Sequence, residues 1–303
     1  MGRIPAPSTA SSDRPPAARM IELQRIPDLR RWVREARGSG RRLALVPTMG
    51  YLHEGHLRLA DEARRCADAV VMSIFVNPLQ FGPTEDLARY PRDLPRDRAL
   101  ARDRGVDALF VPDTAVMYPP GSEIRVVPGP TAERWEGAAR PGHFAGVLTV
   151  VAKLFHLVQP DVACFGRKDI QQATLVRQMV CDLDWPLEIV VVPTVRERDG
   201  LALSSRNAYL EAADRPRAVV LSAALQAAHR AFGAGERGAP AIRAAMERIL
   251  AAEPKVTIEY LAIAEPTALA PVDTVEADTI VALAARIGRT RLIDNIILGE
   301  GLG

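Results

Sequence analysis

The chain has 303 residues, of which 48% are hydrophobic and 25% are charged, a balance typical of a globular protein with one large domain or two ordinary ones. Its 39 basic and 37 acidic residues leave a net charge of only +2, which argues against a nucleic-acid partner or a membrane-surface protein, because either needs a basic excess. No stretch of the sequence approaches the roughly 20 apolar residues that cross a bilayer.

The first 19 residues are rich in Pro, Ala and Ser and contain no hydrophobic segment. They predict a disordered N-terminal tail over 1–19 rather than a secretory signal, and an organellar transit peptide is the weaker alternative. Met20 begins the first patterned segment and is an alternative functional start. Cys66, Cys164 and Cys181 lie far apart in apolar runs without a C-x-x-C pair, which predicts reduced core thiols in a cytoplasmic protein.

Short apolar runs rich in β-branched residues alternate with helix-like stretches over 20–194. The runs are 43–47, 69–76, 108–112, 162–166 and 189–195, and the helix-like stretches include 56–66, 97–105 and 147–158. Strands that are apolar throughout are typical of a parallel sheet buried on both faces. The alternation predicts a Rossmann-like, doubly wound α/β domain, in which ligands bind at the carboxyl ends of the strands.

The pattern changes after about residue 195. Two Ala-rich amphipathic helices are predicted first, followed by strand-like runs at 256–265, 279–288 and 290–298. This predicts a smaller C-terminal α+β domain over 195–303 with a short antiparallel sheet.

Two histidines, His53 and His56, follow the first long strand in "PTMGYLHEGH". A zinc-protease helix carries the different pattern H-E-x-x-H. Gly55 lets the backbone approach a ligand closely, and His56 is expected to open a helix whose free N–H groups favour an anion. The segment therefore predicts a phosphate site, although either histidine alone could be a satisfied core residue. H-x-G-H on an α/β sheet is typical of the nucleotidyltransferase superfamily.

Further polar segments follow the other predicted strands. "FVNPLQFG" offers the amides of Asn77 and Gln80, or is only a turn fixed by Pro78. Arg140 and His143 precede a helix, and an arginine can hold a carboxylate or phosphate in a fork.

"GRKDIQQ" places Lys168 at a strand end, with Asp169 as the expected N-cap and Gln172 on the first helical turn. A solvated surface lysine is the alternative, since most lysines are exposed. "DGLALSSRNAYL" predicts a mobile phosphate-contacting clamp, or only a Ser-rich linker.

Together these segments resemble the pantoate–β-alanine ligase (pantothenate synthetase) family. The resemblance runs from Met20 to about Leu298 and includes, in family order, "PTMGYLHEGH", "SIFVNPLQFG", "DLARYPRD", "RPGHFAGV", "LVQPDVACFGRKD" and "GLALSSRNAYL".

The resemblance implies a ligation in two steps. The pantoate carboxylate attacks the α-phosphate of ATP, which gives pantoyl-adenylate and pyrophosphate. The amine of β-alanine then attacks the adenylate, which gives pantothenate and AMP. Charge that develops during phosphoryl transfer requires cations and positioned donors, and the resemblance implies that His53, His56, Lys168, Arg206 and Mg²⁺ supply them, the two histidines as charged groups.

The resemblance also implies the binding residues. His56 would be the proton donor to the phosphate chain. Asp97 would lie near the metal region, with Mg²⁺ held mainly by ATP phosphates and water. Gln80, Gln172, Arg140 and His143 would hold pantoate or β-alanine. ATP would contact Met49, Gly50, His53, Gly55, His56, Gly166, Lys168, Asp169, Val195, Leu203, Ser204, Ser205 and Arg206. A homodimer is implied in the same way.

The sequence departs from the family pattern at three positions. Arg167 stands where Glu is common, Leu203 replaces a frequent Met, and Arg96 stands where some members carry a second acidic residue. Two other interpretations stay open: another H-x-G-H adenylyl- or nucleotidyltransferase, and a catalytically silent nucleotide-binding protein. A synthetase acting on tRNA is disfavoured, because the sequence has no evident basic anticodon-binding domain.

Overall fold

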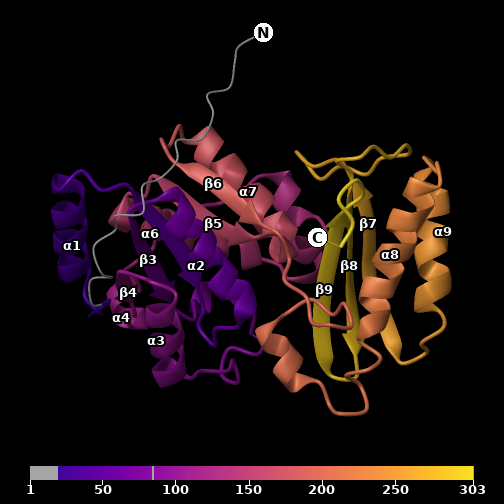
Figure 1. Cartoon of the computed structure of the whole chain (residues 1–303), viewed down its shortest axis with the longest axis horizontal. Coiled ribbons are helices and arrows are strands. Elements are labelled where there is room, and N and C mark those ends of the chain that lie inside the picture. The colour runs from indigo at the N-terminus through magenta and orange to yellow at the C-terminus, as the bar shows by residue number, and fades with distance from the viewer. Residues whose placement is uncertain (1–19, 84, 303) are drawn as a thin grey trace, which may run out of the picture.

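The structure is a computed structural model that describes residues 20–83 and 85–302 (Figure 1). The predicted disordered tail over 1–19 lies outside the described residues. The strands are β1 (Ile21–Leu23), β2 (Leu43–Thr48), β3 (Ala69–Ile74), β4 (Ala108–Phe110), β5 (Val162–Gly166), β6 (Glu188–Val192), β7 (Val256–Ala264), β8 (Ile280–Ile287) and β9 (Thr290–Ile297).

Helices and short 3₁₀ turns connect these strands. They are α1 (Ile26–Gly38), α2 (Glu54–Cys66), η1 (Pro78–Gln80), α3 (Leu94–Asp103), α4 (Thr114–Met117), η2 (Pro130–Glu133), α5 (Glu136–Ala139), α6 (His143–Val158), η3 (Arg167–Asp169), α7 (Ile170–Asp182), η4 (Ser205–Tyr209), α8 (Val219–Gly233) and α9 (Ala239–Leu250).

The first six strands form one parallel sheet in the order β1-β4-β3-β2-β5-β6. The predicted doubly wound α/β architecture is therefore confirmed. The short strand β1 was not expected from the sequence, because a run of three residues carries too little pattern to distinguish it from a loop.

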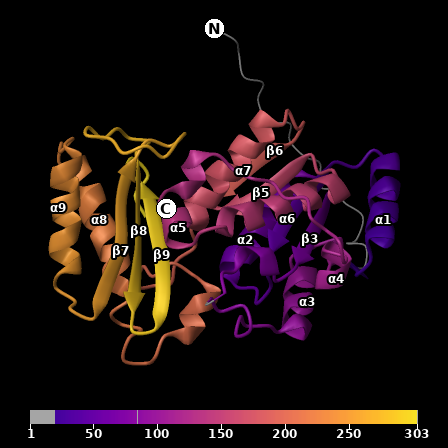
Figure 2. The same ribbon diagram turned by 180° about the vertical axis from the view of Figure 1, so that it is seen from behind.

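Both faces of this sheet are covered by helices, as Figures 1 and 2 show from opposite sides. Leu43 and Leu45 of β2 pack on one face with residues of α1, α6 and α7. Ala44 and Val46 alternate with them in sequence and pack on the other face with residues of α2 and α3. Because alternate side chains of a strand point to opposite faces, burial on both faces requires the continuous apolar runs seen in the sequence.

The strand order places the ligand crevice of the sheet beside β2. The chain runs from β2 through β3 to β4 on one side, and continues with β5 and β6 on the other. The loops after β2 and β5 therefore leave neighbouring strands in opposite directions, which opens a crevice at the carboxyl ends of these strands.

The last three strands form a separate antiparallel sheet in the order β7-β8-β9. Helices α8 and α9 cover one face and share a core with β8 and β9 (Figure 2). On the other face, Ala282 and Tyr260 pack with Ile170 of α7 and with Trp135. The predicted small α+β architecture is thus confirmed, while the boundary between 194 and 195 stays a prediction.

Two ion pairs tie the antiparallel sheet to the rest of the chain. Arg196, which follows β6, donates to both oxygens of Asp294 in β9 at 2.7 and 2.9 Å. Arg291 of β9 donates to both oxygens of Glu136 in α5 at 2.6 and 2.7 Å. Both carboxylates are buried, so removal of either partner would leave a buried charge uncompensated.

The cysteine prediction is only partly correct. Cys164 is buried in β5, whereas Cys66 is half-buried and Cys181 is exposed at the end of α7. The apolar run around Cys181 forms a helix, and a helix exposes one side even where its average hydrophobicity is high. Within residues 20–83 and 85–302, no helix is both long and apolar enough to cross a membrane.

Gly146 determines how closely α6 approaches the loop after β3. A Cβ at Gly146 would lie 2.1 Å from the carbonyl oxygen of Leu79 and 2.6 Å from the backbone nitrogen of Gln80. We predict that Gly146→Ala lowers the free energy of unfolding by about 1–3 kcal/mol, because the backbone must shift.

Gly38→Ala is the matched control for this substitution. A Cβ at Gly38 has no neighbour within 4 Å, so the change should be neutral or stabilise by up to about 1 kcal/mol. Urea unfolding measures both variants, and an unaltered Gly146→Ala protein would contradict the packing described here.

Candidate active site

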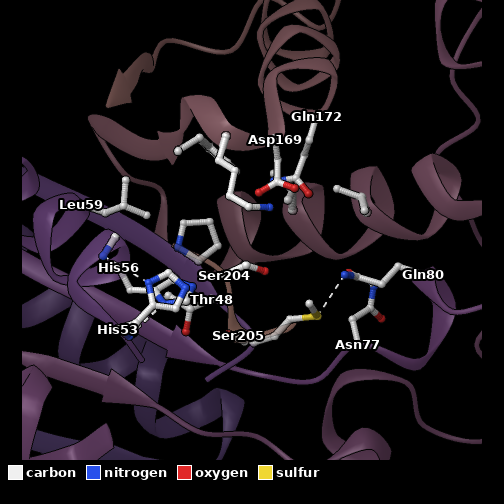
Figure 3. Close-up of a pocket in the computed structure, with 18 of the residues that line it drawn as sticks. Thr48, His53, His56, Leu59, Asn77, Gln80, Asp169, Gln172, Ser204 and Ser205 are labelled. Carbon is white, nitrogen blue, oxygen red and sulfur yellow. Dashed lines mark hydrogen bonds between the residues drawn. The ribbon is translucent and has the colours of Figure 1, made fainter. Parts of the chain in front are cut away.

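A pocket of about 220 Å³ lies at the carboxyl ends of β2, β3, β5 and β6. Figure 3 shows His53 and His56 on one side of it, Gln80 and Asn77 on another, and Asp169 and Gln172 at the start of α7. The pocket brings together most of the predicted site residues: Met49, His53, Gly55, His56, Gln80, Arg140, His143, Gly166, Lys168, Asp169, Gln172, Val195, Leu203, Ser204, Ser205 and Arg206. Gly50 and Asp97 are absent from its lining.

The two histidines form a reciprocal cap on the first turn of α2. The Nδ1 atom of His53 accepts the backbone N–H of Gly55 at 3.1 Å, and the Nδ1 atom of His56 accepts the backbone N–H of His53 at 3.3 Å. His53 is therefore the N-cap residue and α2 begins at Glu54. The expectation that His56 opens the helix was wrong, because the imidazole of His53 takes the capping role usually filled by Ser, Thr or Asp.

This cap fixes the tautomer of both imidazoles. A ring nitrogen that accepts a hydrogen bond carries no proton, so the proton of each neutral ring lies on Nε2. The ring centroids are 4.1 Å apart, and both residues line the pocket. The pair therefore offers the pocket two N–H donors side by side.

Gly55 is required for this arrangement. A Cβ at Gly55 would lie 2.8 and 2.9 Å from Cε1 and Nδ1 of His53. Any side chain there would push the imidazole away from the helix start. The spacing H-x-G-H thus reflects the room that the folded-back ring of His53 needs.

Both histidines are neutral at neutral pH in the protein alone. Burial, followed by the charge of Lys168, lowers the pKa of His53 to about 4. Burial and the neighbouring His53 hold the pKa of His56 well below its ordinary value. The motif therefore supplies neutral hydrogen-bond donors and not the cations expected from the sequence.

Asp97 shapes the loop between β2 and α2. Its two oxygens accept the backbone N–H groups of Tyr51 and Leu52 at 2.8 and 2.7 Å, and its side chain is 1% exposed. Both carboxylate oxygens thus bind amides of the loop, and Asp97 is absent from the pocket lining, so its place near a metal stays a prediction. Arg96 supports the same loop, because it donates to the carbonyl of Leu52 at 2.8 Å.

Gly50 acts on the backbone of this loop. It has a φ of +83°, and a Cβ there would approach Ile74 at 2.9 Å and Asp97 at 3.1 Å. Gly50 is therefore placed as a turn residue beside the pocket, not as a lining residue.

Asn77 fixes the amide of Gln80. The Nδ2 group of Asn77 donates to Oε1 of Gln80 at 3.1 Å and to the carbonyl of Gly146 at 3.1 Å. Because Oε1 of Gln80 accepts this bond, the orientation of its amide is assigned with Nε2 toward Met49 Sδ, at 3.0 Å (Figure 3). Gln80 thus presents two N–H donors, of which the thioether occupies one only weakly.

Arg140 and His143 hold the loop that carries Gln80. The Nδ1–H of His143 donates to the carbonyl of Gln80 at 2.8 Å, and Arg140 donates to the same carbonyl at 3.3 Å. Arg140 also binds both oxygens of Glu85 at 2.9 and 2.6 Å. Burial would raise the pKa of Glu85, but the bonds and charge of Arg140 outweigh it and leave this pKa lowered.

Arg206 forms a similar pair with Asp86, the residue after Glu85. It donates to both oxygens of Asp86 at 3.1 and 3.0 Å. Burial would raise the pKa of Asp86, but Arg206 outweighs it and lowers this pKa. Ser204 accepts the backbone N–H of Arg206 at 3.2 Å, and Ser205 donates to the carbonyl of Tyr51 at 3.4 Å. The clamp segment is therefore folded against the loop after β2.

Lys168 is the exception among the cationic residues of the pocket. Arg140 and Arg206 each bind a carboxylate, whereas no carboxylate in the described part of the chain forms an ion pair with Lys168. Asp169 occupies the N-cap position of α7 as predicted, but its side chain makes no capping bond. An anion in this pocket would therefore meet Lys168 as its most available positive charge.

The described residues do not form a metal centre of their own. Over 20–83 and 85–302 no group of three or more His, Cys, Asp or Glu side chains is placed to hold a metal ion. Glu85 and Asp86 form ion pairs with Arg140 and Arg206. A divalent cation at this site would need oxygen ligands from a bound phosphate group.

Three polar lining residues were missed from the sequence. Ser73 and Thr194 have buried hydroxyl oxygens without a partner among the described residues, and buried Tyr90 lies near Ser205. Ser73 and Thr194 are polar residues within or just after an apolar run, which was the signal that could have identified them. Tyr90 comes from a loop with no such pattern.

Comparison with known proteins gives one family. The sequence profile of the family described as pantoate-beta-alanine ligase matches residues 22–297. The chain is 53% identical over 276 residues to a pantothenate synthetase from Moorella thermoacetica, which covers 91% of this chain and 98% of that protein. It is 54% identical over 270 residues to a pantothenate synthetase from Chloroflexus aurantiacus, with 88% and 96% covered.

Solved structures agree with this result. A crystal structure of pantothenate synthetase from Thermus thermophilus has a TM-score of 0.88 at 52% identity, and covers 92% of this chain and 99% of its own. A structure of pantoate-beta-alanine ligase from Francisella tularensis complexed with beta-gamma ATP and beta-alanine has a TM-score of 0.75 at 31% identity, with 94% and 100% covered.

The lowered histidine pKa values predict a pH dependence of stability. Burial, followed by the charge of Arg140, lowers the pKa of His143 to about 4 as well. A group whose pKa is lower in the folded state than in the unfolded state stabilises the fold fully above the unfolded value, about 6.5. We predict that the free energy of unfolding falls as the pH drops from about 6.5 toward 4, because the unfolded chain takes up the protons.

His143→Asn tests this assignment. Asparagine retains a donor near the Nδ1 position, so the bond to Gln80 can persist. Near pH 5.5, the slope of the free energy of unfolding against pH reports the protons taken up on unfolding. For His143→Asn this number should be about one lower than for the wild type. Equal slopes for the two proteins would mean that His143 titrates normally in the fold.

Proposed function

Since the chain belongs to the pantoate-beta-alanine ligase family, we propose that its pocket joins pantoate to β-alanine at the expense of ATP. In the first step a carboxylate oxygen of pantoate forms a bond to the α-phosphorus, and the bond from that phosphorus to the bridging oxygen breaks. Pyrophosphate leaves with the bonding electrons, and pantoyl-adenylate remains.

The observation that carries this proposal is the set of donors at the start of α2 and at Lys168. The Nε2–H groups of His53 and His56 would bind phosphate oxygens, and the dipole of α2 also favours an anion at the start of this helix. Lys168 would stabilise the charge that grows on the phosphoryl group and on departing pyrophosphate. His56 then acts through a hydrogen bond from a neutral ring, a change from the charged proton donor expected at first.

The ATP site would extend over both walls of the crevice. We assign to it the loop from Met49 to His56, the turn from Gly166 to Asp169, Val195, and the clamp from Leu203 to Arg206. The bond from the backbone N–H of Leu203 to the carbonyl of Val195, 2.9 Å long, supports a common wall of these two segments. Arg206 would stay paired with Asp86 or exchange this partner for a phosphate.

Gln80 and Gln172 would bind pantoate. The orientation of the Gln80 amide supports this role, because its N–H groups suit the carboxylate and hydroxyl oxygens of a small hydroxy acid. Arg140 and His143 would act mainly by holding the carbonyl of Gln80, since Glu85 and that carbonyl occupy their donors.

The second step replaces AMP with β-alanine. The neutral amine attacks the acyl carbon of pantoyl-adenylate, the bond from that carbon to the phosphate oxygen breaks, and AMP leaves. The nitrogen loses one proton as the amide forms. The mixed anhydride already activates the acyl group, so no nucleophilic side chain of the protein is needed.

Three further features belong to this proposal. Mg²⁺ would enter with ATP, bound to its phosphates, because Asp97, Glu85 and Asp86 are engaged in other contacts. A homodimer is inferred from the family resemblance, and Ile124 and Val127, which are 88% and 81% exposed, would be candidate contacts with the second copy. A cytoplasmic location is supported by three cysteines without a disulfide.

A mass-spectrometric assay distinguishes the ligase from the two alternatives. We expect pantoyl-adenylate and pyrophosphate from ATP, Mg²⁺ and pantoate alone, and pantothenate with AMP once β-alanine is added. A different H-x-G-H transferase would bind ATP without using pantoate, and a silent protein would bind ATP without releasing pyrophosphate. Absence of both pantoyl-adenylate and pantothenate would overturn the proposal.

Substitutions at His56 test whether its ring acts as a neutral donor. His56→Ala should slow adenylate formation by about 10²–10⁴-fold, the range for a lost acid–base or electrostatic group. His56→Gln should retain more of the rate, because the glutamine amide can place an N–H near the Nε2 position. Single-turnover quenched flow measures both variants, and equal loss would argue that the imidazole itself is essential.

Lys168→Ala provides the matching test for the available cation. The rate of adenylate formation should again fall by about 10²–10³-fold, as when one transition-state donor is removed. Lys255→Ala, a change at an exposed lysine in the turn before β7, is the control and should leave the rate unaltered. Similar rates for both variants would remove Lys168 from the proposed chemistry.

A further inference from the structure

The last strand of the antiparallel sheet reaches the turn that carries Lys168. The contact is made by Asn295 of β9, whose side chain is 3% exposed. We propose that Asn295 is a positioning residue, which sets the direction of Lys168 toward the phosphate groups. This inference rests on the ligase function proposed above, in which Lys168 contacts ATP.

The carboxamide of Asn295 binds two consecutive carbonyl groups. Its Nδ2 atom donates to the carbonyl of Arg167 at 3.0 Å and to the carbonyl of Lys168 at 2.8 Å. An amide nitrogen has two hydrogens, so both are used. This geometry also fixes the orientation of the amide, because a flipped group would place Oδ1 against two carbonyl oxygens.

These two bonds determine the backbone angles of Lys168. The carbonyl of Arg167 belongs to the peptide before the Cα atom of Lys168, and its own carbonyl belongs to the peptide after it. When both peptide planes are held, φ and ψ of Lys168 are held too, and so is the direction of its Cα–Cβ bond. One buried amide thereby sets the line along which the lysine side chain leaves the turn.

Lys168 has few other restraints in the described chain. Gly166 lies just before the turn, and a Cβ atom added to it would have no neighbour within 4 Å. Asp169 makes no capping bond on α7. No described carboxylate pairs with Lys168, so its direction depends on the backbone of the turn. Arg167 contributes a second attachment, because its guanidinium pairs with Glu300 after β9.

Asn295 is itself held in place. Its backbone N–H donates to Oδ1 of Asp294 at 2.8 Å, and its carbonyl accepts from Arg196 at 3.3 Å. The bidentate pair between Arg196 and Asp294 lies in the same network. Asp294 and Asn295 therefore connect β9 to both segments on this side of the crevice, the one after β6 and the one after β5.

A small cavity next to Asn295 is consistent with this interpretation. It has a volume of about 30 Å³, enough for one water, and Lys168, Tyr260 and Asn295 are among its lining residues. The Oδ1 atom of Asn295 has no hydrogen-bond partner among the described residues. The contacts of this side chain therefore come from its two N–H donors, and its oxygen has no partner among the described residues.

Two substitutions remove the donors in different ways. Asn295→Ala deletes the amide, and Asn295→Asp keeps the shape but turns an oxygen toward the two carbonyls. We expect the rate constant of adenylate formation to fall by about 10–100-fold in both, because a displacement of about 1 Å has that effect on a positioned group. The KM for pantoate should change much less, since Gln80 and Gln172 lie on other elements.

Ile296→Val is the matched control. Ile296 is the next residue of β9 and is buried in the core shared with α8 and α9. The substitution Ile296→Val should lower the free energy of unfolding by about 0.5–1.5 kcal/mol and leave the rate of adenylate formation unaltered. Asn295→Ser, which retains one donor, replaces Asn295→Ala if that protein does not fold, and should show a smaller loss of rate.

A double-mutant cycle with Lys168→Ala decides whether Asn295 acts through the lysine. In that background Asn295→Ala should slow adenylate formation by less than about 2-fold, because the positioned group is already absent. Independent, multiplying losses would overturn the inference, as would a normal rate in Asn295→Asp or an equal loss in Ile296→Val. A wild-type protein that forms no pantoyl-adenylate would instead refute the proposed function.

Discussion

The hydrogen bonds between two imidazoles and the backbone at the start of α2 determine what this site can offer a ligand. Each Nδ1 atom accepts a backbone N–H, so each proton is left on Nε2. Protonation of either ring at Nδ1 would break the cap, and burial together with Lys168 already disfavours the charged form of His53. Tautomer, charge and position of the two rings therefore follow from one local arrangement, for which Gly55 leaves the room.

The positive charges of the pocket are distributed unequally. Glu85 and Asp86, adjacent in sequence, bind Arg140 and Arg206, which come from segments far apart in the chain. This pairing limits repulsion between the cations in the protein alone and ties the loop after β3 to the clamp. Lys168 is left as the most available charge, and the neutral imidazoles supply directional donors beside it. A polyanionic substrate would then be recognised by a few fixed groups and not by a broad basic surface, in agreement with a net charge of only +2.

The sequence was sufficient for the architecture, because parallel strands buried on both faces require continuous apolar runs such as 43–47 and 162–166. It was also sufficient for most lining residues, since polar segments after such strands must meet at one edge of the sheet. It could not provide the partners of these residues. The bonds of Asp97 to Tyr51 and Leu52, and of Asn295 to Lys168, join positions far apart in the chain, and such pairs have no local pattern. The N-cap role of His53 was missed because imidazole seldom caps helices.

Nitrogen NMR of the histidine rings tests the central claim that His53 and His56 are neutral Nε2–H donors. In protein labelled with ¹⁵N-histidine, shifts of the ring nitrogens distinguish the two tautomers and the imidazolium form. The account predicts an unprotonated Nδ1 and a protonated Nε2 for both residues at pH 7, with the pKa of His53 at about 4 and that of His56 well below its ordinary value. A ring of His53 or His56 that is protonated on Nδ1, or an imidazolium at pH 7, would contradict it.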